Sequence, residues 1–273
     1  MAESTPKIEN KAEADELAGT EAPLLEHLIE LRKRLIWSLV AFSALFVACF
    51  FVSKEIYLFL IGPFRQAVGE GGTVEMIFTA PQEQFFTQLS VAMFAAFALA
   101  FPFIAYQIYA FVAPGLYKKE RGAFLPYIVA TPILFLLGGA LVYYGVMPLA
   151  LAFFLGTQVF EEGVTIQMQT RVSEYLGLIM TLLLAFGVCF QLPVLLTLLA
   201  QAELVKAKSL AAWRKYAVVA VLVVAAFLTP PDPISQLGLA LPLLLLYEVS
   251  ILSVKWVERR RARAEAASAE TNT

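Results

Sequence analysis

The chain has 273 residues, of which 60% are hydrophobic and only 15% are charged. A soluble globular domain carries about 25% charged residues and spreads its apolar residues over short periodic runs, whereas this chain holds them in long uncharged blocks. A helix needs about 20 mainly apolar residues to cross a hydrocarbon core about 30 Å thick. The composition therefore excludes an ordinary soluble protein and predicts an all-α membrane protein.

The first 30 residues hold eight acidic side chains against two lysines, Lys7 and Lys11. A cleavable signal peptide has a basic start followed directly by a short apolar core, so we expect the first span to be retained. Few large apolar side chains occur at either end, which is typical of disordered tails. The predicted organisation is an acidic disordered tail at 1–23, a six-helix membrane domain at 24–257, and a basic, then polar, disordered tail at 258–273.

Six transmembrane helices are predicted, and the charges of the segments between them alternate. Basic residues dominate before the first span, after the second, after the fourth and after the sixth, while acidic residues dominate the other connections. Short basic loops stay in the cytoplasm, which predicts that both termini are cytoplasmic. The expected spans are 35–53, 84–112, 122–147, 175–200, 216–229 and 234–254.

Prolines are frequent within the spans, and each removes a backbone donor and favours a kink. The fifth span, 216–229, is short: its length as a helix is about 21 Å at 1.5 Å per residue, less than the hydrocarbon thickness. Such a helix thins the bilayer or shelters against a partner. These features predict a kinked, cup-shaped bundle, and the prolines concerned are Pro102, Pro126, Pro132, Pro148, Pro193 and Pro242.

The residues expected of an enzyme are missing from the sequence. His27 is its one histidine, and Cys49 and Cys189 each lie inside an apolar block, as small buried hydrophobic residues do. Neither a metalloprotease motif nor a serine nucleophile motif occurs. We therefore expect no catalytic residue, no metal, no cofactor and no nucleic-acid partner.

Two predicted cytoplasmic patches each place one prominent acid among basic residues: Glu30 within 27–34 and Glu120 within 114–121. One interpretation, favoured by the residues alone, is an ordinary helical pair between Glu30 and Arg34 together with solvated charges that set the topology. The other is that both carboxylates face one groove, where each would accept a bidentate guanidinium. That site would suit a ligand with adjacent arginines.

Four further polar residues lie in or next to the predicted spans. Gln191 falls near mid-membrane, where its amide either bonds the carbonyl freed by Pro193 or meets a partner helix. Glu248 lies inside the sixth span, where it either reaches toward the interface or pairs with a basic loop residue, and intramembrane acids are functional candidates. Asp232 and Gln236 border the outer hairpin, where turn and helix-cap chemistry also accounts for them.

Four ordered motifs resemble the TatC family, the multispan core of the twin-arginine protein translocase, over residues 24–257. They are His-Leu-Ile-Glu-Leu-Arg-Lys-Arg-Leu at 27–35, Phe-Val-Ala-Pro-Gly-Leu-Tyr-Lys-Lys-Glu-Arg at 111–121, Phe-Gly-Val-Cys-Phe-Gln-Leu-Pro-Val at 186–194 and Thr-Pro-Pro-Asp-Pro-Ile-Ser-Gln at 229–236.

The resemblance implies a receptor in the bacterial inner membrane that binds Arg-Arg signal peptides on its cytoplasmic face. It also implies self-association, contact with lipid, recruitment of the single-span proteins TatA and TatB, and export of folded proteins by the proton-motive force. The implied signal-peptide residues are Glu30, Glu120, Leu31, Arg32, Phe111 and Pro114, and the implied partner-helix residues are Gln191, Asp232, Gln236 and Glu248.

One position departs from the family pattern, because many relatives have glutamate where this chain has Gln191. Glutamine keeps the hydrogen-bonding capacity but exchanges no proton, so we expect a hydrogen-bonding role there. The alternative function is a secondary transporter of a small solute. That class needs a polar midplane site, often between two related halves, and no half-to-half repeat is evident.

Overall fold

The computed structural model describes residues 9–69, 75–116, 125–161, 164–166, 169–228 and 233–271. Helices dominate these residues, and two small pairs of strands accompany them. The elements are α1 (Glu9–Phe51), α2 (Ser53–Leu60), α3 (Gly62–Val68), β1 (Met76–Ile77), α4 (Glu83–Leu116), α5 (Leu125–Leu141), a π-helical turn (Val142–Val146), α6 (Met147–Gly156), β2 (Val159–Glu161), β3 (Val164–Ile166), β4 (Thr170–Arg171), α7 (Val172–Cys189), α8 (Leu192–Gln201), α9 (Ala207–Ala212), α10 (Arg214–Leu228) and α11 (Pro233–Thr271).

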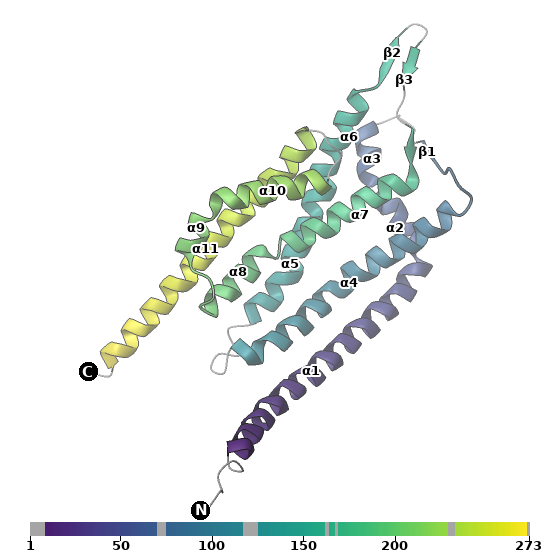
Figure 1. Ribbon diagram of the computed structural model, residues 1–273. Coiled ribbons are helices and arrows are strands. Elements are labelled where there is room, and N and C mark those ends of the chain that lie inside the picture. The colour runs from purple at the N-terminus through teal and green to yellow at the C-terminus, as the bar shows by residue number, and fades with distance from the viewer. Residues whose placement is uncertain are drawn as a thin grey trace, which may run out of the picture.

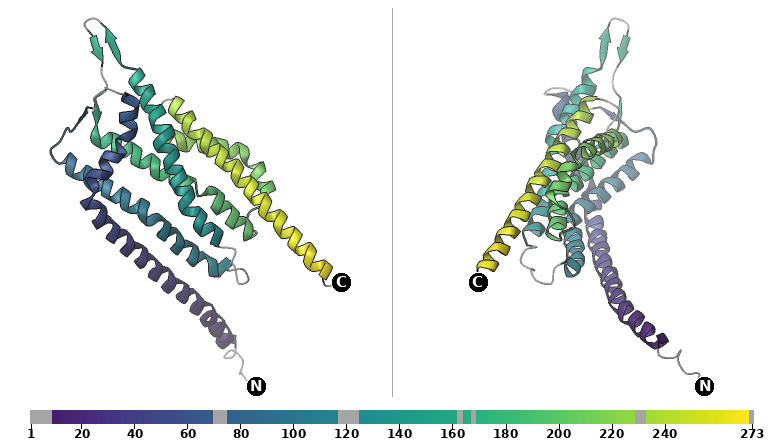
Figure 2. Two further views of the ribbon diagram at one scale, coloured as in Figure 1. Left: turned by 180° about the vertical axis from the view of Figure 1, so that it is seen from behind. Right: turned by 60° about the vertical axis from the view of Figure 1, so that its left-hand side comes forward.

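The long helices lie side by side, with α1 at one edge and the α10–α11 pair at the other (Figures 1 and 2). Helix α1 packs along α4, α5 packs on α7, and α8 packs on α11. Helix α1 begins and α11 ends at the same end of the bundle, which we call the terminal end. The β2–β3 hairpin stands at the opposite end, which we call the loop end. An even number of membrane crossings requires that both ends of the chain lie at the same end of the bundle, as the start of α1 and the end of α11 do here.

Within the part of the chain that the structure describes, five helical stretches are long and apolar enough to cross a membrane: His27–Phe51, Glu83–Phe111, Pro126–Gly156, Val172–Gln201 and Gln236–Arg263. They overlap all the predicted spans except the fifth. That span corresponds to α10, whose 15 residues make a helix of about 22 Å. The chain is thus a multispan helical membrane protein. The count of six crossings and the cytoplasmic location of both termini stay predictions.

The predicted end of the third span at residue 147 is wrong, because the helix continues through a π-helical turn to Gly156. Pro148, one of the prolines expected within the spans, lies at the start of α6, directly after the π-helical turn. A proline in the first turn of a helical segment does not end it. The membrane-length stretch Pro126–Gly156 is therefore longer than the sequence indicated.

The first and last helices continue into the two regions that the sequence predicted as tails. Helix α1 begins at Glu9 and α11 continues to Thr271. Both helices thus extend beyond the predicted membrane domain of 24–257, and that division into tails and domain stays a prediction.

Two tyrosine hydroxyls tie the short helices of the loop end to the bundle. Tyr143, in the π-helical turn, donates to the carbonyl of Phe59 at 2.7 Å, and its ring stacks on the Phe59 ring. Tyr175, in α7, donates to the carbonyl of Leu60 at 2.9 Å. These bonds satisfy carbonyls at the end of α2, which have no partner within the helix.

Helices α5 and α7 approach closely at two glycines. A Cβ atom on Gly138 would lie 2.7 Å from the carbonyl oxygen of Phe186, and one on Gly187 would lie 2.5 Å from the ring of Phe135. Small residues let membrane helices pack backbone to backbone. This contact fixes α5 against the C-terminal half of α7, directly before the break at Gln191.

Candidate functional site

The α1–α4 seam near the terminal end holds Glu30, the first predicted site residue. Arg34 donates from Nη2 to Glu30 Oε1 at 2.5 Å and from Nε to the same oxygen at 3.0 Å. Its remaining nitrogen, Nη1, donates to Oε1 of Gln107 on α4 at 3.2 Å. The helical pair expected from the sequence is therefore present, and Gln107 holds its arginine from a second helix.

The same seam contains a ring contact one helical turn closer to the terminal end. His27 stacks on Phe111 with ring centroids 4.1 Å apart. His27, Glu30 and Arg34 are spaced i, i+3, i+7 on α1 and so share one helical face. That face meets Gln107 and Phe111, which are one turn apart on α4. The seam thus aligns a carboxylate and two rings on neighbouring helices.

The other predicted signal-peptide residues are distributed around this seam. Leu31 and Arg32 are exposed on α1, next to Glu30 in the sequence. Pro114 lies in the last turn of α4, and its side chain is outside the described residues. Glu120 also lies outside the described residues; it follows the last residue of α4, Leu116, by four positions in the sequence.

Gln191 lies in the turn between α7 and α8, with its amide directed into the bundle. Its Nε2 donates to the carbonyl of Thr131 on α5 at 3.1 Å and to the carbonyl of Gly187 at 3.3 Å. Its Oε1 is buried and accepts no hydrogen bond from the described residues. The amide therefore joins α5 to the α7–α8 break.

The carbonyl that Gln191 satisfies is not the one that the sequence indicated. Pro193 leaves the carbonyl of Cys189 without its helical donor, but the side chain bonds Gly187 instead. The Gln191 backbone N–H donates to the carbonyl of Val188, three residues earlier. In a regular α-helix it would donate to the carbonyl of Gly187, four residues earlier, so that carbonyl has no backbone donor here. The side chain replaces that donor.

A chain of hydroxyl groups continues from Gln191 across α5 to α4. Thr131, which is fully buried, donates its hydroxyl to the carbonyl of Tyr127 at 2.8 Å. The hydroxyl of Tyr109 lies 3.0 Å from that of Thr131. Because a threonine hydroxyl carries one hydrogen, Tyr109 is the donor in this pair. The polar network thus links α4, α5 and the α7–α8 turn inside the membrane region.

The α10–α11 edge contains two predicted partner-helix residues, both bonded within the chain. Gln236 donates from Nε2 to the carbonyl of Leu222 on α10 at 3.3 Å. Glu248 accepts from Nη2 of Arg214, the first residue of α10, at 2.7 Å. Of the two alternatives considered for Glu248, the structure shows the pair with a basic residue, which comes from the start of α10. Asp232 lies outside the described residues.

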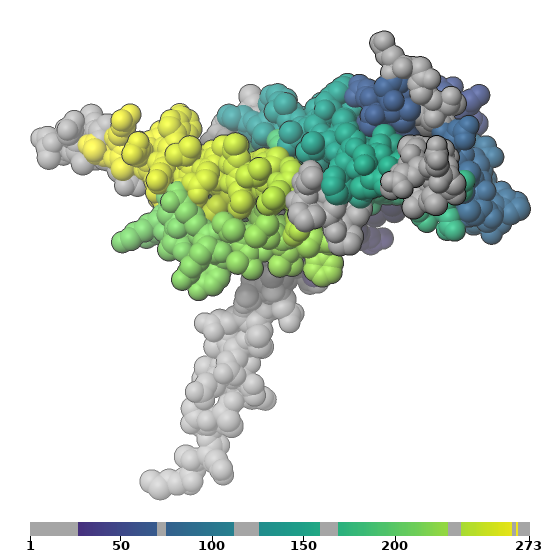
Figure 3. Space-filling view, turned by 90° about the horizontal axis from the view of Figure 1, so that it is seen from above, coloured from purple at the N-terminus to yellow at the C-terminus, as the bar shows by residue number. Residues whose placement is uncertain are grey.

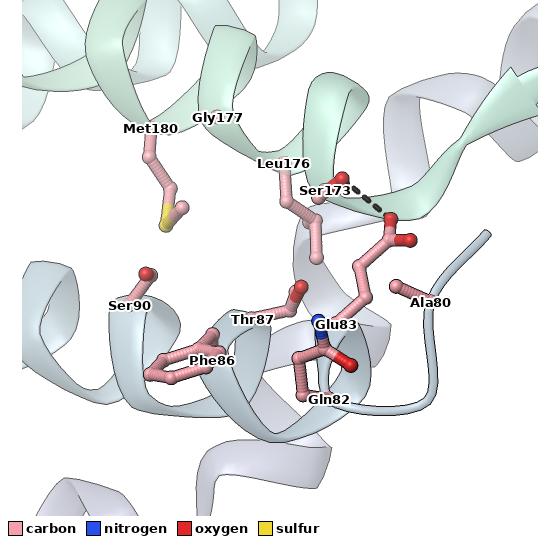
Figure 4. Close-up of a pocket in the computed structure, with 10 residues that line it drawn as sticks. All are labelled: Ala80, Gln82, Glu83, Phe86, Thr87, Ser90, Ser173, Leu176, Gly177 and Met180. Carbon is pink, nitrogen blue, oxygen red and sulfur yellow. Dashed lines mark hydrogen bonds between the residues drawn. The ribbon is translucent and has the colours of Figure 1, made fainter. Parts of the chain in front are cut away.

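A cavity of about 340 Å³ opens at the loop end between the first turns of α4 and α7 (Figure 4). Glu83 accepts a hydrogen bond from the Ser173 hydroxyl at 2.5 Å and another from the Thr79 backbone at 2.7 Å. The carboxylate therefore ties α4 to α7 beside the cavity. Sequence reasoning did not single out this contact, because its two side chains lie 90 positions apart.

Comparisons with known proteins identify the family. The family model for "Sec-independent protein translocase protein (TatC)" matches residues 26–242. The chain belongs to the TatC family. The Sec-independent protein translocase protein TatC of Magnetococcus marinus is 47% identical, with 90% of this chain and 89% of that protein covered. The TatC protein of Escherichia coli is 37% identical, with 89% and 92% covered.

Solved TatC structures agree with the fold. The crystal structure of the twin arginine translocase receptor TatC has a TM-score of 0.74 and 36% identity, and the match covers 85% of this chain and 99% of that one. As a TatC protein, this chain is a multispan membrane component of the Sec-independent protein translocase. Its function is protein transport, so the small-solute transporter considered from the sequence is set aside.

Proposed function

We propose that the terminal end of this TatC protein is a receptor for signal peptides with two adjacent arginines. It faces the cytoplasm of a bacterium, both chain ends lie on that side of the inner membrane, and six helices cross the bilayer. Glu30 and Glu120 accept the two guanidinium groups, while Leu31, Arg32, Phe111 and Pro114 border the site. The observation that carries the proposal is the geometry of Glu30 at the α1–α4 seam.

Glu30 is suited to this role because it is charged, partly exposed and held in position. Its side chain is 36% exposed, and both bonds from Arg34 go to the same oxygen, Oε1. The second oxygen, Oε2, accepts no bond that involves the described residues and is available to a ligand guanidinium. Because Gln107 anchors Arg34, the carboxylate is oriented before the ligand arrives, which lowers the entropic cost of binding.

The surroundings of Glu30 fit an arginine pair better than a lysine pair. Guanidinium groups stack on aromatic planes and bind carboxylates in a bidentate manner, and the seam offers the stacked His27 and Phe111 rings one turn from Glu30. An ammonium group forms neither contact equally well. A second acid, Glu120, follows the helix that supplies Phe111, so each arginine has its own acceptor.

The α10–α11 edge is proposed to recruit the single-span TatA and TatB proteins, and copies of the chain are proposed to associate in the receptor complex. Helix α10 is shorter than the hydrocarbon core, and its Phe227 is 87% exposed. A partner helix shelters such an edge better than a thinned bilayer does.

Gln191 supports the adjacent bundle through hydrogen bonds, and its buried Oε1 would accept a hydrogen bond from a partner's polar side chain that entered the bundle. Folded proteins cross at the expense of the proton-motive force.

Site-specific crosslinking to an Arg-Arg signal peptide tests the receptor proposal. We expect Glu30→Ala and Glu120→Ala each to weaken the crosslink, and a Lys-Lys peptide to give none. Glu174→Ala is the matched control, because it removes an exposed glutamate that is paired with an arginine at the loop end, 3.4 Å from Arg171. Unchanged crosslinking in both site variants, with normal membrane insertion, would refute the assignment.

A further inference from the structure

The C-terminal part of α11 carries a group of basic side chains beside an exposed tryptophan. Trp256 is 62% exposed, and the guanidinium of Arg260 lies 5.5 Å from the centre of its ring. This part of the helix projects beyond the neighbouring helices in the space-filling view (Figure 3). We call this surface the basic end of α11, and it consists of Lys255, Trp256, Arg259, Arg260 and Arg263, all exposed.

The carboxylates that the structure describes near this surface are already engaged by other groups. Glu258 accepts from the backbone N–H of Ala207 at the start of α9, at 2.9 Å. Glu203 pairs with Arg261, and Glu248 pairs with Arg214. These acids therefore face α9, α10 and the chain before α9. The positive charge of the basic end of α11 is not neutralised by them.

The basic end of α11 continues a face that meets lipid. Leu241, Leu245 and Leu252 are each more than 60% exposed, as side chains in contact with acyl chains are. Positions 245, 252, 256, 259 and 263 recur at spacings of 7, 4, 3 and 4, so they follow one stripe along the helix. The same stripe thus changes from leucine to tryptophan and then to arginine toward the terminal end.

The depth of these side chains matches the layers of a bilayer. About 20 residues of helix cross the hydrocarbon core, and counting from Gln236 this core ends near Lys255. Trp256 is then at the interface, where tryptophan is enriched. Arg259 and Arg263 lie roughly 5 and 11 Å further along the helix, at a rise of 1.5 Å per residue, which is the depth of the lipid phosphates.

We infer that the basic end of α11 binds the headgroup of an anionic phospholipid, with Arg259 and Arg263 on the phosphate and Trp256 against the glycerol region. The continuity of the stripe favours lipid over a soluble acidic partner, because the acyl chains of the bound molecule lie along Leu245 and Leu252. Polybasic segments next to a membrane helix attract anionic lipid through the same electrostatics. The inference requires that α11 spans the bilayer and does not depend on signal-peptide binding.

Native mass spectrometry of the full chain, purified in detergent and titrated with phosphatidylglycerol or phosphatidylcholine, tests the inference. We expect preferential retention of phosphatidylglycerol, and a fall of about 30-fold in its apparent affinity in the double variant Arg259→Gln/Arg263→Gln, given the attraction of each of the two basic residues near a membrane surface. The charge-conserving pair Arg259→Lys/Arg263→Lys should retain most of the binding.

The matched control is Lys54→Gln/Arg65→Gln, which removes two exposed basic residues at the loop end and should leave the preference unchanged. Equal retention of the two lipids by the unaltered chain would overturn the inference. So would a control variant that loses as much binding as Arg259→Gln/Arg263→Gln. Displacement of the bound lipid by millimolar inorganic phosphate would also contradict it, since the acyl chains would then contribute nothing.

Discussion

Replacing Gly138 with alanine tests the close contact between α5 and α7. The new Cβ atom would lie 2.7 Å from the Phe186 carbonyl oxygen and 3.0 Å from the Phe190 ring. Ordinary contact begins at 3.4 Å, so the helices must separate by about 0.7 Å, and a packed interior resists such a shift. Overpacking of this kind costs about 1–3 kcal/mol, which exceeds the gain of up to ~1 kcal/mol from better helix propensity.

Gly139→Ala is the matched control, because its Cβ would meet only Leu183, at 3.8 Å. The control keeps the propensity gain and lacks the clash, so the two variants should differ by about 2 kcal/mol in the free energy of unfolding. A shift of 1 kcal/mol moves the Tm by about 2–4 °C in a chain of this size range. Thermal unfolding in detergent should therefore separate Gly138→Ala from Gly139→Ala by about 4–8 °C, and equal Tm values would refute the packing argument.

Two further substitutions test the polar contacts of the bundle. Gln191→Leu removes the bond to Thr131, which we expect to cost about 0.6–1.7 kcal/mol of stability. If the amide also binds a partner helix, co-purification of TatA or TatB should fall while membrane insertion stays normal. Normal recovery of TatA and TatB would leave only the role inside the bundle. Tyr175→Phe leaves the Leu60 carbonyl unbonded, so limited proteolysis within 53–68 should accelerate, whereas Tyr144→Phe, at a ring that is 66% exposed, should change nothing.

The sequence predicted the helical membrane fold because hydropathy and loop charge act locally along the chain. The 15 residues of α10 agree with the short fifth span expected from the uncharged block. The continuation to Gly156 was missed although the uncharged block runs to Phe160, because an apolar run does not by itself show at which residue a helix ends.

The candidate site was predictable in composition but not in its contacts. The Glu30–Arg34 pair follows from an i, i+4 spacing, so the residues alone indicated it. The anchoring of Arg34 by Gln107 spans 73 positions, and that of Gln191 by Thr131 spans 60. Such contacts depend on which helices are neighbours, which periodicity does not determine. The cost of an unpaired amide in the membrane predicted that Gln191 needs a partner, but the carbonyl considered for it, the one freed by Pro193, is not one of those that it bonds.

The receptor proposal is tested most directly by a double-mutant cycle between Glu30→Gln and a signal peptide with one arginine replaced by glutamine. Loss of the Glu30–Arg34 pair should cost only about 0.3–0.5 kcal/mol of stability, so the variant stays folded. Direct contact predicts a coupling energy of about 1 kcal/mol or more for one of the two arginines, within the range measured for residues in contact. Effects on the dissociation constant that add to within about 0.3 kcal/mol for both arginines would contradict a contact between Glu30 and the peptide.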